Sequence, residues 1–148
     1  MRKTLAITLG DPAGVGPEIT AKALDDPELY QRCKPLVVGD AAILRRACDL
    51  VGRPELQIHS VQNPAEGLYR AGTIDVLDMG LLQPTDYELG KVSAQAGNAA
   101  FQYVRKAIEL AMAGKGDATV TNPLNKEALN LAGHHFSGHT EIYAHYTN

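Results

Sequence analysis

The residues of this chain that could do chemistry gather between positions 121 and 141. Five polar side chains fall within seven residues there: His134, His135, Ser137, His139 and Thr140. A histidine beside a threonine hydroxyl offers two hydrogen-bonding groups at fixed positions, and a protonated imidazole adds positive charge. Such a pair suits an anionic ligand. The same residues would also suit a solvated connection between two helices, so the pattern alone leaves both interpretations open.

A second candidate segment is GDPAGVGPE, residues 10–18, between a predicted strand and a predicted helix. Its glycines let a ligand approach the main chain, and the start of the helix favours an anion. The spacing matches neither the GxGxxG fingerprint nor a Walker loop, so we do not expect a Rossmann cofactor site. Asp11 is expected to hold the turn by accepting bonds from backbone amides, and it could also line a cleft. Glu18 has the same two interpretations, since it favours the positive end of a helix.

The histidines do not predict a metal site. His134 and His135 are adjacent, so they cannot easily bind one ion together, and His139 and His145 lie six residues apart, which is no common helical ligand spacing. We therefore expect no complete metal site in this sequence. His59 is interpreted as a strand-face residue.

Apolar patterning predicts the elements that position these residues. Strands are expected over residues 3–9, 35–39, 56–61, 73–77 and 118–121, the third near a sheet edge and the last short and buried. Helices are expected over residues 17–24, 41–51, about 92–113 and 141–146. Another helix is expected to begin at Asn122 and Pro123, to place Leu131 on its apolar side and to stop at Gly133. Alternating strands and helices predict an α/β fold, a mostly parallel sheet with helices on both faces, in a single region over residues 1–148.

Composition limits the possible functions. The 148 residues, 45% of them hydrophobic and 21% charged, suit one globular domain. A net charge of −3 gives no electrostatic case for nucleic acid or an anionic membrane, and no apolar run approaches a membrane span. The amino terminus is not typical of a signal peptide. Cys33 and Cys48 lack metal-ligand spacing and are expected to be thiols in a reducing cytoplasm.

Three segments together resemble one enzyme family. They are TNPLNKEAL followed by AGHHFSGHTE (121–141), GDPAGVGPE (10–18), and the weaker Gly90-Lys91 with AQAG (94–97). In sequence and in order they resemble the 4-hydroxythreonine-4-phosphate dehydrogenase (PdxA) family, which includes sister enzymes acting on 4-phospho-D-threonate and 4-phospho-D-erythronate. The three segments span nearly the whole chain.

The resemblance implies a fold, a reaction and site residues. It implies an isocitrate/isopropylmalate-dehydrogenase-like fold, homodimeric, with the active site in a cleft between subunits. It implies NAD(P)-dependent oxidation of a secondary alcohol, giving a β-keto acid that loses carbon dioxide, with a divalent metal whose ligands lie beyond residue 148. His139 and Thr140 would contact the substrate, with Lys126 and Asp11 as weaker candidates. The catalytic and nicotinamide-binding residues are not identified in this chain. Family members are longer, so we expect an amino-terminal part of a two-domain cytoplasmic enzyme.

The resemblance implies first a substrate of the 4-phosphohydroxy-L-threonine type, and the alternative is a 4-phospho-D-threonate or 4-phospho-D-erythronate dehydrogenase of sugar-acid catabolism. The biosynthetic enzyme acts on 4-phosphohydroxy-L-threonine in pyridoxal phosphate synthesis, whereas the sisters degrade the D-threonate or D-erythronate phosphates. Residues 90–97 and 122–126 favour the catabolic sisters. A different class of function is a catalytically incomplete fragment that binds a ligand or a partner without turnover.

Overall fold

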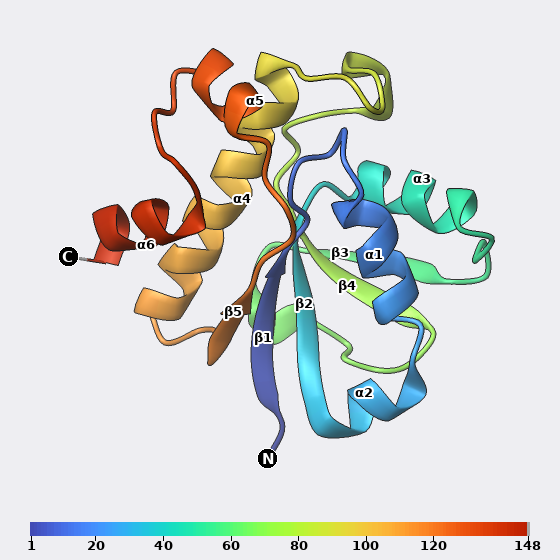
Figure 1. The fold of residues 1–148 in the computed structure, drawn as a ribbon. Helices are drawn as coiled ribbons and strands as arrows, with labels where there is room; N and C mark the ends of the chain where they lie inside the picture. The colour runs from blue at the N-terminus through green and yellow to red at the C-terminus, as the bar shows by residue number, and fades with distance from the viewer. Residues whose placement is uncertain (148) are drawn as a thin grey trace.

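The computed structural model describes residues 1–147. Over these residues the chain forms one parallel sheet of five strands in the order β3-β4-β2-β1-β5 (Figure 1). The strands are β1 (Lys3–Thr8), β2 (Cys33–Gly39), β3 (Gln57–Val61), β4 (Thr73–Asp78) and β5 (Ala118–Val120). The helices are α1 (Gly16–Ala23), α2 (Pro27–Arg32), α3 (Ala41–Leu50), α4 (Ala94–Met112), α5 (Lys126–Leu131) and α6 (His139–Thr147), with short 3₁₀ turns η1 (Pro64–Glu66) and η2 (Pro84–Asp86). The predicted α/β class is confirmed.

The strand order explains why helices cover both faces of the sheet. The β1-α1-β2 connection moves along the sheet in one direction, and the β4-α4-β5 connection moves in the opposite direction. Because crossovers between parallel strands are right-handed, these two connections place their helices on opposite faces. Figure 1 shows α4 on the other side of the sheet from α1 and α3.

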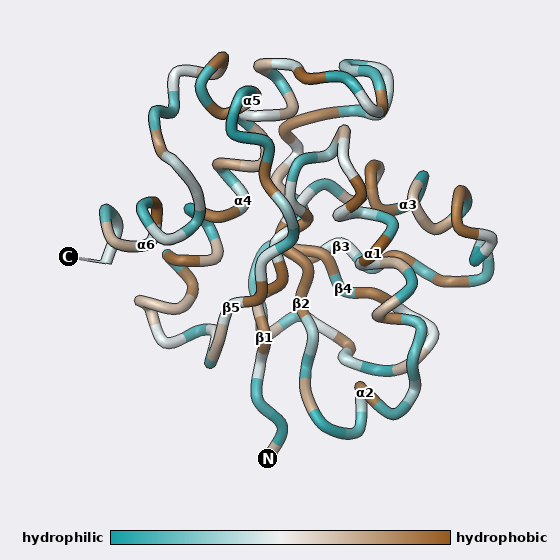
Figure 2. The backbone as a smooth tube through the Cα atoms, in the orientation of Figure 1, coloured by the Kyte–Doolittle hydropathy of each residue, from teal (hydrophilic) through white to brown (hydrophobic). Residues whose placement is uncertain are grey.

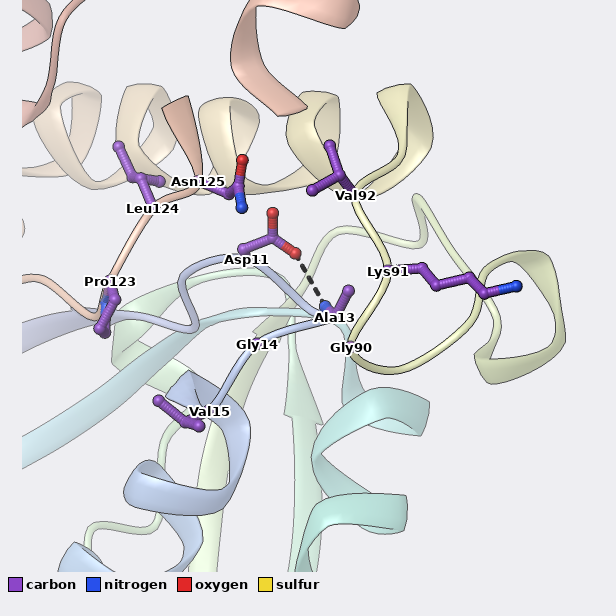
Figure 3. A pocket seen from close by; sticks show the side chains of 10 residues that line it. All are labelled: Asp11, Ala13, Gly14, Val15, Gly90, Lys91, Val92, Pro123, Leu124 and Asn125. Carbon is purple, nitrogen blue, oxygen red and sulfur yellow. Dashed lines mark hydrogen bonds between the residues drawn. The ribbon is translucent and has the colours of Figure 1, made fainter. Parts of the chain in front are cut away.

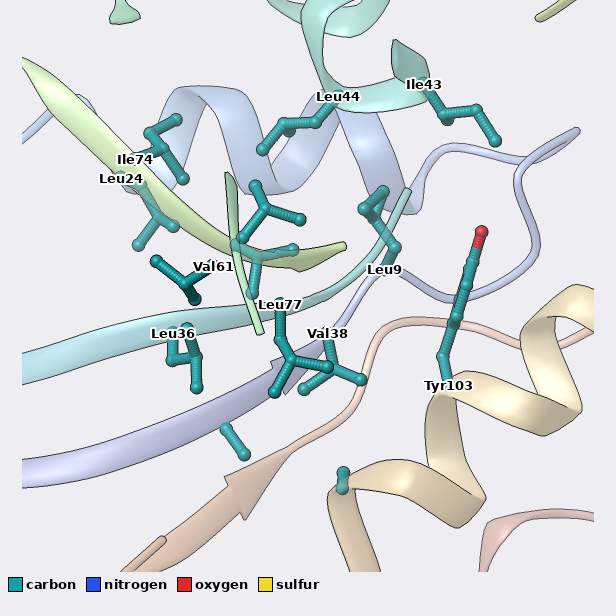
Figure 4. Packing of buried hydrophobic residues seen from close by; sticks show 14 of the residues in the cluster. Leu9, Leu24, Leu36, Val38, Ile43, Leu44, Val61, Ile74, Leu77 and Tyr103 are labelled. Atoms are coloured by element: carbon teal, nitrogen blue, oxygen red, sulfur yellow. The ribbon is translucent and has the colours of Figure 1, made fainter. Parts of the chain in front are cut away.

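The main core lies between the sheet and these helices. Figure 4 shows Leu36 and Val38 of β2 and Leu9, which follows β1, in one cluster with Leu44 of α3 and Tyr103 of α4. Figure 2 shows the same distribution along the backbone, with the hydrophobic stretches on the central strands. A second, smaller cluster joins α4, α5 and α6 and consists of Phe101, Val104, Ile108, Leu129 and Ile142. Ile142 is fully buried, so the last helix packs against this cluster through that residue.

One predicted strand, β5, is more exposed than expected. β5 was expected to be buried, but Ala118 is exposed and Val120 retains 45% exposure. The cause is its place in the sheet, since β5 pairs only with β1 over the described residues and so forms an edge. The prediction that residues 56–61 form a strand near an edge is confirmed, because β3 is the other outer strand.

The helix after β5 begins later than predicted. The cap is Asn125, whose side chain accepts a bond from Ala128 N, and α5 starts at Lys126. Asn122 does not cap a helix, because its amide is used elsewhere in the core. Leu131, expected on the apolar side, is 59% exposed. Gly133 follows the end of the helix with a φ of 88°, as predicted for a stop.

Two further differences concern helix boundaries. The sequence did not predict α2, a six-residue helix capped by Asp26 and started by Pro27, because so short a segment shows little periodicity. The long helix begins at Ala94 with Ser93 as its cap, so Val92, predicted as part of its apolar stripe, precedes it and is 40% exposed.

Candidate functional site

The three segments singled out in the sequence meet at the carboxyl end of β1 and β5. Asp11 N donates to Pro123 O over 3.0 Å, which joins the loop after β1 to the loop after β5. Gly90 N donates to Ala13 O over 2.8 Å, which brings the third segment to the same place. Open parallel sheets bind ligands at this edge of their strands.

The loops enclose an open hollow of about 290 Å³ between them. Figure 3 shows the residues that line it: Asp11, Ala13, Gly14, Val15, Gly90, Lys91, Val92, Pro123, Leu124 and Asn125. Every one of the three segments contributes to this lining. The hollow is therefore the candidate site.

Asp11 is the one carboxylate that lines this hollow. Its Oδ1 accepts a bond from Ala13 N over 2.8 Å, which confirms the prediction that it holds the turn. Burial raises the pKa of Asp11, and the bond from the Ala13 amide acts in the opposite direction. In Figure 3 the carboxylate lies between Asn125 and Val92, so the side chain that fixes the turn also faces the hollow.

Two glycines of the first segment are required by close approaches of the backbone. Gly10 has a φ of 76°, and a Cβ there would lie 2.7 Å from Pro123 O. At Gly16, in the first turn of α1, a Cβ would lie 2.1 Å from Leu9 O. These glycines let the loops after β1 and β5 pack together, so packing alone accounts for them.

The polar groups at the rim differ in how firmly they are held. Asn125 uses its Oδ1 to accept the bond from Ala128 N, which fixes the side chain at the hollow and leaves its amide NH₂ as a donor. Lys91 bonds to Glu88 at 2.7 Å, and Figure 3 shows its side chain extending away from the hollow. Asn125 is therefore the better-positioned donor.

The predicted substrate residues His139 and Thr140 lie at the start of α6, and neither lines the hollow. Thr140 is exposed. His139 is half-buried, and its Nε2 is a buried atom with no hydrogen-bond partner within the described part of the chain. Burial lowers the pKa of His139, and the Asn122 backbone acts in the opposite direction. His139 is thus held beside the loop that lines the hollow, with one ring nitrogen unsatisfied.

Lys126 is the exposed first residue of α5 and follows Asn125 directly. It lies close enough to Glu141 to help lower the pKa of that carboxyl, after the larger effect of the bonds from Ser137. Of the four predicted site residues, Asp11 alone lines the hollow, and the other three lie on the helices that follow its rim.

Two of the remaining histidines, His59 and His134, have structural partners. His134 stacks on Phe101 with ring centroids 3.7 Å apart, and its Nε2 lies 2.9 Å from Asn98 Oδ1. His59, interpreted as a strand-face residue, lies with Nδ1 2.8 Å from Oδ1 of the buried Asp75. Within residues 1–147 no group of three His, Cys, Asp or Glu side chains is arranged to hold a metal ion.

Sequence reasoning missed Ala13 and Val92 as lining residues. Ala13 contributes a backbone carbonyl and amide, and Val92 follows a loop whose position depends on the Gly90 contact. Neither side chain carries chemistry, so the only available signal was membership of the segments that contain them. No helix in the described part of the chain is long and apolar enough to cross a membrane.

The chain is similar to known proteins in sequence and in fold. Residues 31–148 match the family model for the pyridoxal phosphate biosynthetic protein PdxA. A protein of Symbiobacterium thermophilum described as a putative D-threonate 4-phosphate dehydrogenase is 47% identical over 99% of this chain and 43% of its own length. The D-threonate 4-phosphate dehydrogenase of Cupriavidus necator is 46% identical over 97% of this chain and 42% of its own length.

A solved structure gives the same result for the fold. The crystal structure of a 4-hydroxythreonine-4-phosphate dehydrogenase from Burkholderia phymatum superposes with a TM-score of 0.93 at 48% identity, over 98% of this chain and 43% of the other. The chain therefore spans less than half the length of the relatives that it matches.

Proposed function

Because the chain belongs to the PdxA family, we propose that it forms part of a dehydrogenase that oxidises a phosphorylated four-carbon hydroxy acid. The observation that supports this most is the meeting of residues 10–18, 90–97 and 121–141 around one hollow. At about 290 Å³ the hollow is on the scale of small-molecule sites. Its position at the carboxyl end of parallel strands is the usual one for such sites.

The first candidate substrate is D-threonate 4-phosphate. Relatives described by that substrate are 47% and 46% identical to this chain over nearly all of its length. The second candidate is 4-hydroxythreonine 4-phosphate, favoured by the crystal structure at 48% identity. The two compounds differ in the group beside the carboxylate, which is a hydroxyl in one and an amine in the other.

The charges of the candidate residues suggest which residue would contact which group of the substrate. Asp11 would repel a phosphate but can accept a hydrogen bond from a hydroxyl or an amine, so we assign it to the hydroxy-acid end. Lys126, His139 and Thr140 offer donors suited to an anion, and we assign the phosphate to them.

Oxidation of a hydroxyl group requires a hydride acceptor, and we propose NAD or NADP for this role. The residues described do not by themselves fit a metal, since they hold no suitable group of three ligands. The remaining part of such an enzyme would supply the cofactor contacts and any metal ligands. A second copy of the enzyme would be the partner in a homodimer. The protein's own residues bind the substrate and orient it.

The test uses a hybrid protein that joins this chain to the part of the Cupriavidus necator dehydrogenase that lies outside the match. Nicotinamide reduction is followed by absorbance with each candidate substrate, NAD or NADP, and a divalent metal. Turnover with D-threonate 4-phosphate supports the first candidate, and turnover with 4-hydroxythreonine 4-phosphate supports the second. A folded hybrid that reduces no cofactor with either substrate would overturn the proposal.

Cofactor reduction and calorimetric binding, both measured on this chain alone, separate an enzyme from a binding fragment. Binding of D-threonate 4-phosphate in calorimetry, without cofactor reduction, would show that these residues hold the ligand but do not complete the site. The competing interpretation, a remnant that binds ligand only, predicts binding by this chain and no turnover even in the hybrid.

A further inference from the structure

A second hollow, of about 310 Å³, lies at the amino ends of β1 and β2, at the opposite end of the strands from the candidate site. Figure 1 shows the amino terminus of the chain at this end of the sheet. The η1 turn, the segment that follows it and the loop after α4 complete the walls. Six of the lining residues are Thr4, Lys34, Asn63, Gly67, Tyr69 and Lys115. The two hollows share no lining residue.

The lining of this hollow carries two positive charges and, among the described residues, no carboxylate. Lys34 and Lys115 come from separate elements, and within residues 1–147 neither forms an ion pair with a carboxylate. Asp117, close to Lys115 in the chain, accepts a bond from Thr4 N over 2.8 Å and does not line the hollow. Two ammonium groups at one hollow repel each other, and an anion bound there would remove this repulsion.

Tyr69 forms a fixed wall of the hollow in an unusual backbone conformation. Its φ is 50°, in the left-handed region that residues with a side chain rarely adopt. Tyr69 N donates to Oδ2 of the buried Asp75 over 2.8 Å, and Arg2 Nη1 donates to Tyr69 O over 2.9 Å. The Tyr69 hydroxyl donates to Pro64 O over 2.6 Å. Strained conformations that the surrounding structure holds in this way cluster at ligand sites.

Two further groups are held at the hollow as donors. Lys34 Nζ lies 5.7 Å from the centre of the Tyr69 ring, a cation–π contact that keeps the ammonium group beside this wall. Asn63 Oδ1 accepts a bond from Ala65 N over 3.2 Å, which leaves the side-chain NH₂ as a donor. Lys115 adds the second ammonium group from the loop after α4. Donors from three separate parts of the chain therefore line one hollow.

We propose that this hollow binds the phosphate group of a small molecule. A phosphate monoester carries about −1.5 to −2 charges at neutral pH, which matches two ammonium groups, whereas a carboxylate carries a single charge. Lysine binds phosphate as a point charge, so the match depends on charge and position alone. A volume of about 310 Å³ is on the scale of small-molecule sites. This site is separate from the candidate active site and does not rest on the proposed function.

Nuclear magnetic resonance of the isotope-labelled chain tests the proposal. Inorganic phosphate and glycerol 3-phosphate are each titrated at constant ionic strength, with sodium acetate as the comparison anion. Both phosphate compounds should shift the amide signals of Thr4, Lys34 and Gly67 until the shifts saturate, and acetate should not. Lys34→Gln and Lys115→Gln should each weaken the binding by about tenfold, because each removes one of the two charged donors.

Lys22→Gln is the matched control, because Lys22 is exposed on α1 and does not line this hollow. Lys126→Gln separates the two sites, since the Thr4 signal should respond to phosphate in this variant as it does in the unsubstituted chain. The spectra themselves show whether each variant is folded. The hybrid with the Cupriavidus necator part should bind phosphate with the same affinity as this chain. An equal response to acetate, unchanged affinity in both variants of the lining lysines, or no binding by the hybrid would overturn the proposal.

Discussion

Single side chains at the candidate site combine a structural and a chemical role. Asp11 holds the loop after β1 through its bond from Ala13 N, and it also faces the hollow. Asn122, one residue before the loop proline, donates from Nδ2 to Thr8 O and to Thr20 Oγ1, both over 2.8 Å. Asn122 thus ties the loop after β5 to the end of β1 and to Thr20 within α1, and Asp11 holds the loop after β1.

Replacing Asp11 with Asn should stabilise this chain at neutral pH and impair the hybrid enzyme. Burial raises the pKa of Asp11, so the folded state favours the protonated carboxyl, and its contribution to stability is lost as the pH rises through the folded pKa. Asn keeps an acceptor for Ala13 N and has no charge to bury. The thermal midpoint of Asp11→Asn should therefore exceed that of the unsubstituted chain at pH 7 and approach it at acidic pH.

The activity of the Asp11→Asn hybrid should fall by about 10²-fold or more if the carboxylate accepts a substrate hydrogen bond. Asp49→Asn, at an exposed residue of α3, is the control and should change neither reading. Unchanged activity in the Asp11 variant would remove Asp11 from the substrate site.

Replacing Asn122 with Ala should destabilise the fold. The substitution removes two buried hydrogen bonds and leaves Thr8 O without its side-chain donor, which costs about 2–4 kcal/mol. Urea unfolding measures the loss, with Asn130→Ala on the exposed side of α5 as the matched control. Equal midpoints for the two variants would show that Asn122 is not a structural link.

At the scale of elements, the approach of α5 to α4 decides where the 121–141 segment lies. Gly97 is on α4, and a Cβ there would lie 2.1 Å from Ala128 O of α5. Leu129 of α5 and Ile142 of α6 then fill the second cluster with Phe101. The glycine in AQAG is therefore needed for the close contact of α4 and α5, and Asn125, directly before α5, lines the hollow.

Replacing Gly97 with Ala should force α5 away from α4. Overpacking of this kind costs about 1–3 kcal/mol, although the higher helix propensity of Ala offsets part of the loss. Gly138→Ala is the control, since a Cβ at Gly138 meets no atom within 4 Å. Chemical denaturation should show a lower midpoint for Gly97→Ala alone. Ligand binding should weaken with it if the start of α5 belongs to the site.

At the scale of the whole molecule, one buried contact joins the two sides of the carboxyl edge. The hydroxyl of Tyr103, on α4, donates to Asp40, the residue after β2, and Leu81 N donates to the same carboxylate over 2.7 Å. Burial raises the pKa of Asp40, and the bonds from Tyr103 and the backbone counteract it. The helix on one face is thereby fixed to the loops that follow β2 and β4.

Replacing Tyr103 with Phe should destabilise the chain more at neutral than at acidic pH. The variant loses a bond to a buried carboxylate, about 1.5–3 kcal/mol when Asp40 is ionised. Without that donor the pKa of Asp40 rises further, so stability is lost more steeply as the pH rises through it. Thermal unfolding across pH measures the effect, with Tyr146→Phe on α6 as the control. A deficit independent of pH would show that packing, and not the Asp40 contact, is the cause.

The sequence by itself determined the class of fold and the identity of the relevant segments. Apolar patterning over four or more residues predicted β1–β4 and the long helix to within a few residues, because such patterns depend on local periodicity alone. The motifs at 10–18, 90–97 and 121–141 carried the family resemblance, which the family model confirms. The turn role of Asp11 also followed from local chemistry.

Only the tertiary structure decided which of those residues meet. Asn is a residue type that often caps helices, and Asn122 was expected to do so. The packing of β5 beside β1 instead directs the side-chain amide of Asn122 into the core, and Asn125 caps the helix. Val120 is of a residue type common in buried strands, yet it is 45% exposed because β5 lies at an edge of the sheet. Burial and partnership depend on contacts between residues far apart in the chain, and no local pattern contains them.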